Sequence, residues 1–131
     1  MSRILLADDS PHAQRMGERI LRDEGFEVVT VTDGESAIIR LADFDPDLIV
    51  ADAFLPQKSG YEICQFVRND PRFRHTRIVL TAGAMEALDE EEARRAGVDA
   101  TLKKFKEEYL AYVNKGVGLT AQPLRLDISL R

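Results

Sequence analysis

Five short apolar runs alternate along the chain with segments whose apolar residues recur at helical spacing, and this alternation restricts the possible folds more than any other feature. The runs cover residues 4–7, 28–31, 48–51, 78–81 and, more weakly, 100–102. A run that is apolar at nearly every position is typical of a strand covered on both faces. Five alternations of strand and helix predict an α/β fold, in which a parallel sheet carries helices on both faces.

Residues that start and stop helices lie between these runs. Ser10 and Pro11 supply an N-cap and a first-turn proline for the first helix. Asp89 with Glu92 forms a capping pair for the fourth helix, which ends at Gly97. The five expected helices lie around residues 13–21, 37–42, 63–67, 89–97 and 107–115.

Size and composition narrow the class of protein. With 131 residues, 44% of them apolar, the chain has enough material for one domain with its own core. A net charge of −5 without any basic block argues against nucleic acid as a partner. No apolar stretch is long enough for a membrane span or a signal peptide. The single cysteine, Cys64, excludes an internal disulfide, so we expect one cytoplasmic domain.

The alternation of strands and helices ends near residue 116. We therefore expect a domain over 1–116 and a C-terminal tail or linker over 117–131. Four apolar residues of this tail alternate strictly with polar ones, at the period of a half-buried strand: Leu124, Leu126, Ile128 and Leu130. A flexible tail, a strand for a partner, and the first strand of a further domain are the three open interpretations.

Polar residues follow the apolar runs at the edge of the sheet where ligands bind in such folds. They are Asp8 and Asp9 after the first run, Asp52 after the third, Thr81 at the end of the fourth, and Lys103 and Lys104 after the fifth. Taken singly, each has a plainer explanation, because an aspartate also suits a helix N-terminus and a lysine also suits a solvated surface. The convergence of these residue types at one edge is what indicates a functional site.

The chemistry of this set favours phosphoryl transfer. Carboxylates that converge at one edge of the sheet repel one another, by roughly 4 kcal/mol for a pair 4 Å apart with an effective dielectric near 20. Mg²⁺ relieves that repulsion and prefers oxygen ligands. A carboxylate beside Mg²⁺ can act as the nucleophile toward a phosphoryl group, while a lysine offsets charge and a threonine hydroxyl donates a hydrogen bond to the product.

These segments resemble the receiver domain of two-component response regulators, in particular the single-domain chemotaxis type. The resemblance covers residues 1 to about 115 and is carried by four pieces: 4–10 (ILLADDS), 52–60 (DAFLPQKSG), 80–82 (LTA), and 97–99 (GVD) followed by lysine. It implies a flavodoxin-like, doubly wound sheet with strand order 2-1-3-4-5. Pro56 and Gly60 are expected to be turn residues.

The resemblance also implies roles for individual residues. Asp52 would accept the phosphoryl group from a histidine kinase or phosphotransfer protein, with Thr81 as the switch hydroxyl. Asp9 and Asp52 would ligate Mg²⁺, Asp8 would act mainly through water, and the Phe54 carbonyl would be a further ligand. The active-site lysine is expected at Lys104, seven residues after Gly97, with Lys103 as the alternative if the strand carries a bulge.

Three departures from the family pattern are present. Phe105 stands where a proline usually follows the lysine, and Thr101 stands where an aromatic switch residue is frequent. Phe54 and Gly83 occupy positions where polar side chains often steer the hydrolytic water, and this pair predicts slow dephosphorylation.

The resulting hypothesis is a phosphorylation switch read by a downstream effector protein, promoting only its own phosphorylation and dephosphorylation and acting on no other substrate. Two alternatives stay open. One is a receiver-like interaction module that works without phosphorylation, which the residues at 101 and 105 favour. The other is the input domain of a longer regulator whose output domain follows Arg131. A phosphatase with an aspartate nucleophile is disfavoured, because Phe54 stands where it needs a second aspartate.

Overall fold

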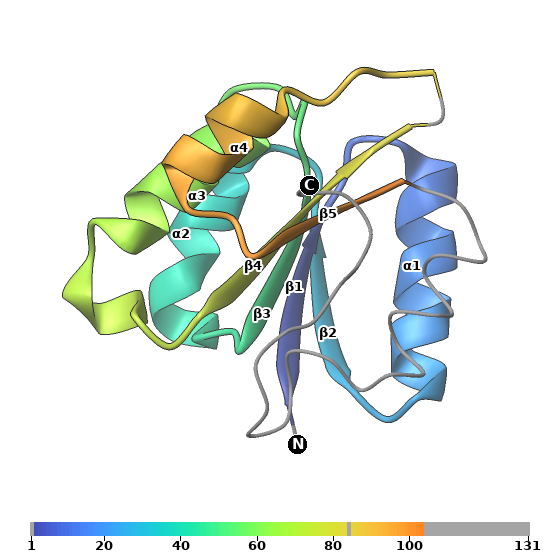
Figure 1. The fold of residues 1–131 in the computed structure, drawn as a ribbon. Helices are drawn as coiled ribbons and strands as arrows, with labels where there is room; N and C mark the ends of the chain where they lie inside the picture. The colour runs from blue at the N-terminus through green and yellow to red at the C-terminus, as the bar shows by residue number, and fades with distance from the viewer. Residues whose placement is uncertain (1, 84, 104–131) are drawn as a thin grey trace.

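The computed structural model describes residues 2–83 and 85–103, and these residues form a five-stranded parallel sheet flanked by helices (Figure 1). The strands are β1 (Arg3–Ala7), β2 (Glu27–Val31), β3 (Leu48–Asp52), β4 (Arg77–Ala82) and β5 (Ala100–Lys103). Their order across the sheet is β2-β1-β3-β4-β5, and every pair is parallel. The expected flavodoxin-like order is therefore confirmed, including the weak fifth strand.

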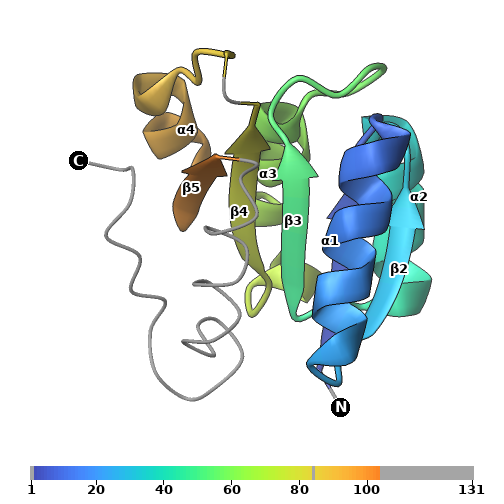
Figure 2. The same cartoon turned by 90° about the vertical axis from the view of Figure 1, so that its right-hand side faces the viewer.

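Helices cover both faces of the sheet. They are α1 (Pro11–Asp23), α2 (Gly34–Phe44), α3 (Gly60–Arg68) and α4 (Glu90–Ala96), with a 3₁₀ turn η1 (Pro71–Phe73) after α3. Figures 1 and 2 show α1 on one face and α2, α3 and α4 on the other. The expected fifth helix (107–115), the boundary near 116 and the alternating tail lie outside the described residues. None of the described helices has the length and apolar character that crossing a membrane requires.

The sheet separates two apolar layers, because successive side chains of a strand point to opposite faces. Leu5, Ile49 and Ile78 belong to the layer under α2, α3 and α4. Ile4, Leu48 and Val79 belong to the layer under α1. This double coverage explains why the strands read as continuous apolar runs rather than as alternating ones.

Side-chain caps set the limits of the helices. Ser10 caps α1 by accepting a hydrogen bond from the Ala13 amide, with Pro11 in the first turn, as expected. Asp89 caps α4 by accepting one from the Glu92 amide, and Gly97 ends that helix at φ 88°. That left-handed conformation suits glycine, which has no Cβ to clash. The helix ends therefore lie close to where the sequence placed them.

Candidate functional site

The site lies at the carboxyl ends of β1, β3 and β4. Asp8 directly follows β1, Asp52 is the last residue of β3, and Thr81 is the register partner of Asp52 on β4. Each lies an even number of residues after a side chain of the layer under α1, namely Leu6, Val50 and Val79. Because side chains alternate along a strand, each site residue points to the same face of the sheet as the apolar residue two positions before it. On that face, each strand therefore changes from an apolar to a polar side chain at its carboxyl end.

Three carboxylates meet at this edge. One ligand oxygen from each of Asp8, Asp9 and Asp52 lies within 4.8 Å of the others, and this is the one such cluster among the residues described. Asp8 is 1% exposed and Asp52 4% exposed, whereas Asp9 is exposed to solvent. Negative charges this close in a partly buried place raise the energy of the site, and a cation offsets that cost.

Backbone amides orient the two buried carboxylates. The Ser10 amide donates a 2.9 Å hydrogen bond to Oδ1 of Asp8, and the Phe54 amide donates a 2.8 Å hydrogen bond to Oδ1 of Asp52. Each amide lies two residues after the carboxylate it binds, so the loop leaving each strand turns back over the strand end. Both carboxylates are therefore fixed by local main-chain geometry.

Gln14 of α1 holds the first loop in place, a role that the sequence analysis missed. Its Nε2 donates to the Asp8 carbonyl at 3.3 Å and to the Val31 carbonyl at 3.2 Å, while the Asp8 amide donates to the Val31 carbonyl at 3.0 Å. One side chain thus joins the ends of β1 and β2. A polar residue on the first helix, four positions after the N-cap, was the available signal, but such residues are usually solvated.

Thr81 lies beside Asp52, as expected. Its side chain belongs to a residue only 1% exposed, and its carbonyl accepts a 2.9 Å hydrogen bond from the Ala53 amide. Two residues further, the Gly83 amide donates to Oε1 of Glu86 at 2.6 Å, and the Glu86 amide donates back to the Gly83 carbonyl at 3.1 Å. Two hydrogen bonds thus join Gly83 and Glu86 just past the end of β4, next to the site.

Gly60 has a different role from the turn residue expected. It is the first residue of α3, and its backbone packs directly on the phosphoacceptor candidate. A Cβ at this position would lie 2.7 Å from the Asp52 carbonyl oxygen and 2.8 Å from Cδ2 of Leu80. The absence of a side chain is thus required by close approach of the helix to the strand, rather than by an unusual φ.

The lysine remains a prediction. β5 ends at Lys103, whose register partner is Ala82 on β4, so the main chain of β5 reaches the same edge as Thr81. Lys104 lies outside the described residues. The choice between Lys103 and Lys104 therefore still depends on the sequence.

The donor set fits Mg²⁺. All side-chain ligand atoms of the cluster are carboxylate oxygens, which this ion prefers, and the exposure of Asp9 leaves access for the water ligands that Mg²⁺ retains. Nitrogen and sulfur ligands, which favour zinc, are missing from this cluster. The arrangement can therefore hold a divalent cation next to a carboxylate nucleophile.

Several known proteins are similar to this chain in sequence. The profile of the response regulator receiver domain matches residues 4–113. The chain is 30% identical over 117 residues to protein PilG of Pseudomonas aeruginosa, covering 88% of this chain and 87% of PilG. It is 34% identical over 104 residues to the response regulator PleD of Caulobacter vibrioides, covering 79% of this chain but 22% of PleD.

Solved structures show the same architecture. The chemotaxis response regulator CheY4 of Vibrio cholerae superposes with a TM-score of 0.78 at 27% identity, covering 88% of this chain and 98% of CheY4. A putative response regulator from Chloroflexus aurantiacus gives the same TM-score at 28% identity, covering 88% of this chain and 95% of that one. With the matched profile, the strand order and the acidic edge of the sheet in agreement, this chain belongs to the response regulator receiver domain family.

Proposed function

We propose that this chain is a phosphorylation switch in which Asp52 accepts a phosphoryl group from the phosphohistidine of a histidine kinase or phosphotransfer protein. The observation that carries the proposal is the clustering of the Asp8, Asp9 and Asp52 carboxylates within 4.8 Å, with Thr81 paired to Asp52 on the neighbouring strand. Receiver domains are signalling domains, and membership of that family supports the role.

The proposed reaction is a displacement at phosphorus. A carboxylate oxygen of Asp52 attacks the phosphorus atom, so a P–O bond forms while the N–P bond to the imidazole breaks. The imidazole nitrogen keeps the electron pair and takes up a proton. The hydroxyl of Thr81 then donates a hydrogen bond to a phosphoryl oxygen on Asp52, which favours the phosphorylated state.

The metal ligands proposed are the carboxylates of Asp9 and Asp52, the Phe54 carbonyl and, through water, Asp8. When bound there, Mg²⁺ offsets the negative charge of the carboxylates and of the transferred phosphoryl group. The Phe54 amide orients Asp52 by donating a 2.8 Å hydrogen bond to Oδ1 of its carboxylate.

Lys104 is proposed as the active-site ammonium. It lies an even number of residues after Ala100 and Leu102, whose side chains belong to the layer under α1. The side-chain rows that lead to Asp8, Asp52 and Thr81 have the same parity. Lys103 differs by one position, which in a regular strand selects the opposite face.

The proposed output is a change in the surface around α4 and the expected fifth helix, read by an effector protein or domain. We place this activity in the cytoplasm, without a nucleic-acid or membrane partner for this domain. The chain promotes its own phosphorylation and dephosphorylation and converts no free substrate. Slow dephosphorylation is part of the proposal, because Phe54 and Gly83 supply no side-chain hydrogen bond to an attacking water.

Intact mass spectrometry tests the proposal directly. The protein is incubated with phosphoramidate or acetyl phosphate, with and without Mg²⁺, as wild type, Asp52→Asn and the control Asp43→Asn, which changes an exposed carboxylate on α2. A single phosphoryl adduct that requires Mg²⁺ and Asp52, and that the control retains, is the expected result. A folded wild type without any adduct from either donor would instead favour the phosphorylation-independent module.

A second proposal is that this chain is one domain of a longer response regulator. The chain spans 87% of PilG, but only 46% of the DNA-binding response regulator MtrA of Mycolicibacterium smegmatis and 22% of PleD. Receiver domains thus occur both nearly alone and as parts of longer regulators. The length of the parent reading frame decides whether an output domain follows Arg131.

A further inference from the structure

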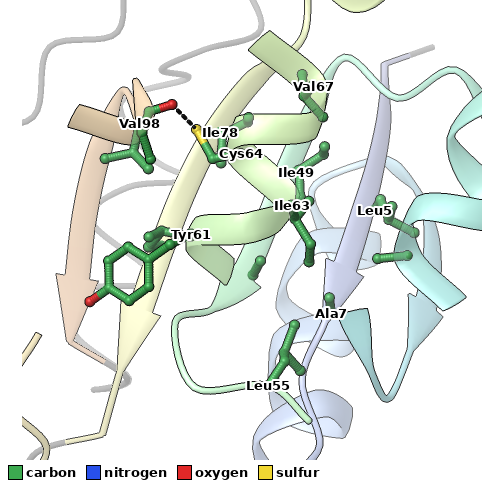
Figure 3. Packing of buried hydrophobic residues seen from close by; sticks show 14 of the residues in the cluster. Leu5, Ala7, Ile49, Leu55, Tyr61, Ile63, Cys64, Val67, Ile78 and Val98 are labelled. Atoms are coloured by element: carbon green, nitrogen blue, oxygen red, sulfur yellow. Dashed lines mark hydrogen bonds between the residues drawn. The ribbon is translucent and has the colours of Figure 1, made fainter. Parts of the chain in front are cut away.

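One face of α3 contacts the α4 segment at three levels. The Asp89 amide donates a 3.0 Å hydrogen bond to the Tyr61 hydroxyl, and the Cys64 thiol donates one of 3.1 Å to the Ala96 carbonyl. At the far end, Nε of Arg68 donates to the Gly97 carbonyl at 2.9 Å. Spacings of three and four residues put Tyr61, Cys64 and Arg68 on one side of the helix. Figure 3 shows Tyr61 and Cys64 at the same end of the apolar cluster as Val98.

Tyr61 differs from the other two because the residue before it, Gly60, contacts the proposed phosphoacceptor. Its neighbour Gly60 packs so closely on Asp52 that a Cβ there would lie 2.7 Å from the Asp52 carbonyl oxygen and 3.0 Å from Cα of Ala53. The Gly60 amide also donates a 3.1 Å hydrogen bond to the Ala53 carbonyl. The first turn of α3 is therefore in direct contact with the end of β3 and with the loop that follows it.

The Tyr61 hydroxyl contacts the residue at the start of α4 through its hydrogen bond with the Asp89 amide. Asp89 is the N-cap of that helix, and its side chain accepts a 3.0 Å hydrogen bond from the Glu92 amide. The Tyr61 hydroxyl fixes the main chain of the same residue, where the loop after β4 becomes helix. Because α4 has only seven residues, its position depends strongly on its cap and its tertiary contacts.

The hydrogen bond between the Tyr61 hydroxyl and the Asp89 amide does not depend on a titrating group near neutral pH. Tyr61 is 5% exposed, and burial raises the pKa of its hydroxyl, so the group stays neutral and accepts the Asp89 N–H throughout the physiological range. The hydrogen bond is therefore insensitive to pH near neutrality. The hydrogen bond forms or breaks when α3 is displaced relative to the loop before α4.

We propose that Tyr61 couples the state of Asp52 to the position of α4, through its hydrogen bond to the Asp89 amide. This inference rests on the proposed phosphorylation of Asp52. A phosphoryl group there adds oxygens that compete for the Phe54 amide, which now donates to Oδ1 of Asp52, so the loop from β3 to α3 rearranges. The first turn of α3, in contact with the Asp52 carbonyl, follows that loop and carries the Tyr61 hydroxyl with it.

Residue-resolved NMR tests the coupling. Amide shifts of residues 53–60 and 89–97 are recorded with and without phosphoramidate and Mg²⁺ on wild type, Tyr61→Phe and the control Thr101→Val, which removes the hydroxyl of another buried residue. In Tyr61→Phe the unphosphorylated Asp89 amide should exchange about tenfold faster, the effect of losing one ordinary hydrogen bond. Phosphorylation should then shift residues 53–60 as in wild type but shift residues 89–97 by less than half as much.

The possible outcomes separate the two proposals. A wild type that shows no adduct by intact mass contradicts the proposed function itself. A wild type that is phosphorylated, together with Tyr61→Phe giving the full shift of residues 89–97, overturns the coupling alone. A reduced response in Thr101→Val equal to that in Tyr61→Phe would also overturn it, because the effect would then be general loosening of the core.

A second pair of variants guards against a folding defect of Tyr61→Phe. Asp89 has φ −83°, close to the range that proline adopts, so Asp89→Pro removes the amide donor with little change in the main chain. Asp89→Ala loses the same capping carboxylate but keeps the amide. A response of α4 that is lost in Asp89→Pro and kept in Asp89→Ala is the expected result, and equal responses in the two variants contradict the coupling.

Discussion

The backbone amide of Phe54 donates a 2.8 Å hydrogen bond to Oδ1 of Asp52, the carboxylate two residues before it. The bond turns the chain back over the end of β3, and the Phe54 side chain is left 44% exposed at the rim of the site. Gly83, two residues after Thr81 and just past the end of the neighbouring strand β4, has no side chain. The main chain of Phe54 therefore orients the Asp52 carboxylate, and neither Phe54 nor Gly83 offers a side-chain hydrogen bond to water.

This arrangement predicts that Phe54→Asn hydrolyses its phosphoryl group faster than wild type. The amide side chain can hold the attacking water, and one hydrogen bond of that kind corresponds to an increase of about 2- to 10-fold in rate. The measurement is the decay of the adduct by intact mass after removal of the donor. Phe66→Asn, a change to another partly exposed phenylalanine away from the site, is the control. Equal half-lives for wild type and Phe54→Asn would refute the prediction.

A second prediction concerns the repulsion between the three carboxylates. Asp9→Asn removes one negative charge from a cluster whose oxygens lie within 4.8 Å of one another, so in EDTA the free energy of unfolding should rise by roughly 1 kcal/mol. Mg²⁺ should then stabilise wild type and have much less effect on Asp9→Asn, because one ligand is lost. Thermal melts with EDTA and with Mg²⁺ give both quantities.

The control for that experiment is Asp43→Asn, which removes an exposed carboxylate paired with Arg40 on α2. It should respond to Mg²⁺ as wild type does. An Asp9→Asn variant that is stabilised by Mg²⁺ as much as wild type would show that Asp9 is not a ligand.

The fold was predictable because its signals are local. Apolar runs covered on both faces, and caps such as Ser10 and Asp89, depend on neighbouring residues in the sequence, so the strands and most helix limits agreed with the structure. The strand order, which also agreed, followed from the resemblance to receiver domains. Asp8, Asp9 and Asp52 were also found, because the ends of parallel strands meet at one edge. Lys104, selected by its spacing from Gly97 in the receiver family, and the tail, identified by its alternating apolar residues, lie outside the described residues.

The parts that sequence reasoning missed depend on contacts between distant elements. Gln14 on α1 reaches the Val31 carbonyl at the end of β2, and Tyr61 on α3 reaches the Asp89 amide before α4. The expected turn residue Gly60 instead gives the space that α3 needs against β3. Helical periodicity reports which face of a helix is buried, but it does not report which backbone group a buried polar side chain meets.

Arg68 gives a third prediction, on stability. Its guanidinium donates to the Gly97 carbonyl at 2.9 Å, the Thr76 carbonyl at 2.8 Å and Oδ2 of Asp99 at 2.8 Å. Asp99 Oδ2 in turn accepts the Ile78 amide at 2.7 Å, so one side chain joins α3, β4 and the start of β5. Arg68→Ala should lower the free energy of unfolding by about 2 kcal/mol, with a smaller loss for Arg68→Lys.

Urea denaturation measures this loss, and Arg95→Ala is the matched control. Arg95 is a mostly exposed arginine on α4 that pairs with Glu91 at 3.6 Å, and exposed pairs of this kind contribute about 0.5 kcal/mol or less. If Arg68→Ala were no more destabilising than Arg95→Ala, the three hydrogen bonds would have no structural role.

The fourth prediction follows from Cys64, whose thiol is buried in the apolar layer under α3. Burial raises the pKa of Cys64 from 9.0 to about 12. Below pH 9 the thiol is protonated in the folded and unfolded states alike, so its contribution to stability is fully present there. Between pH 9 and 12 the unfolded chain releases a proton that the folded chain retains, and this contribution is lost by about 1.4 kcal/mol per pH unit.

Comparison with Cys64→Ala isolates this effect, because the other titrating groups, including Tyr61 with its raised pKa, are common to both proteins. At pH 7.5 wild type should be the more stable, since the alanine leaves a cavity and loses the hydrogen bond to the Ala96 carbonyl. Urea midpoints at pH 7.5, 9 and 10 should show the difference between the two proteins narrowing above pH 9. A difference that stays constant to pH 10 would mean that the folded thiol ionises as readily as the unfolded one.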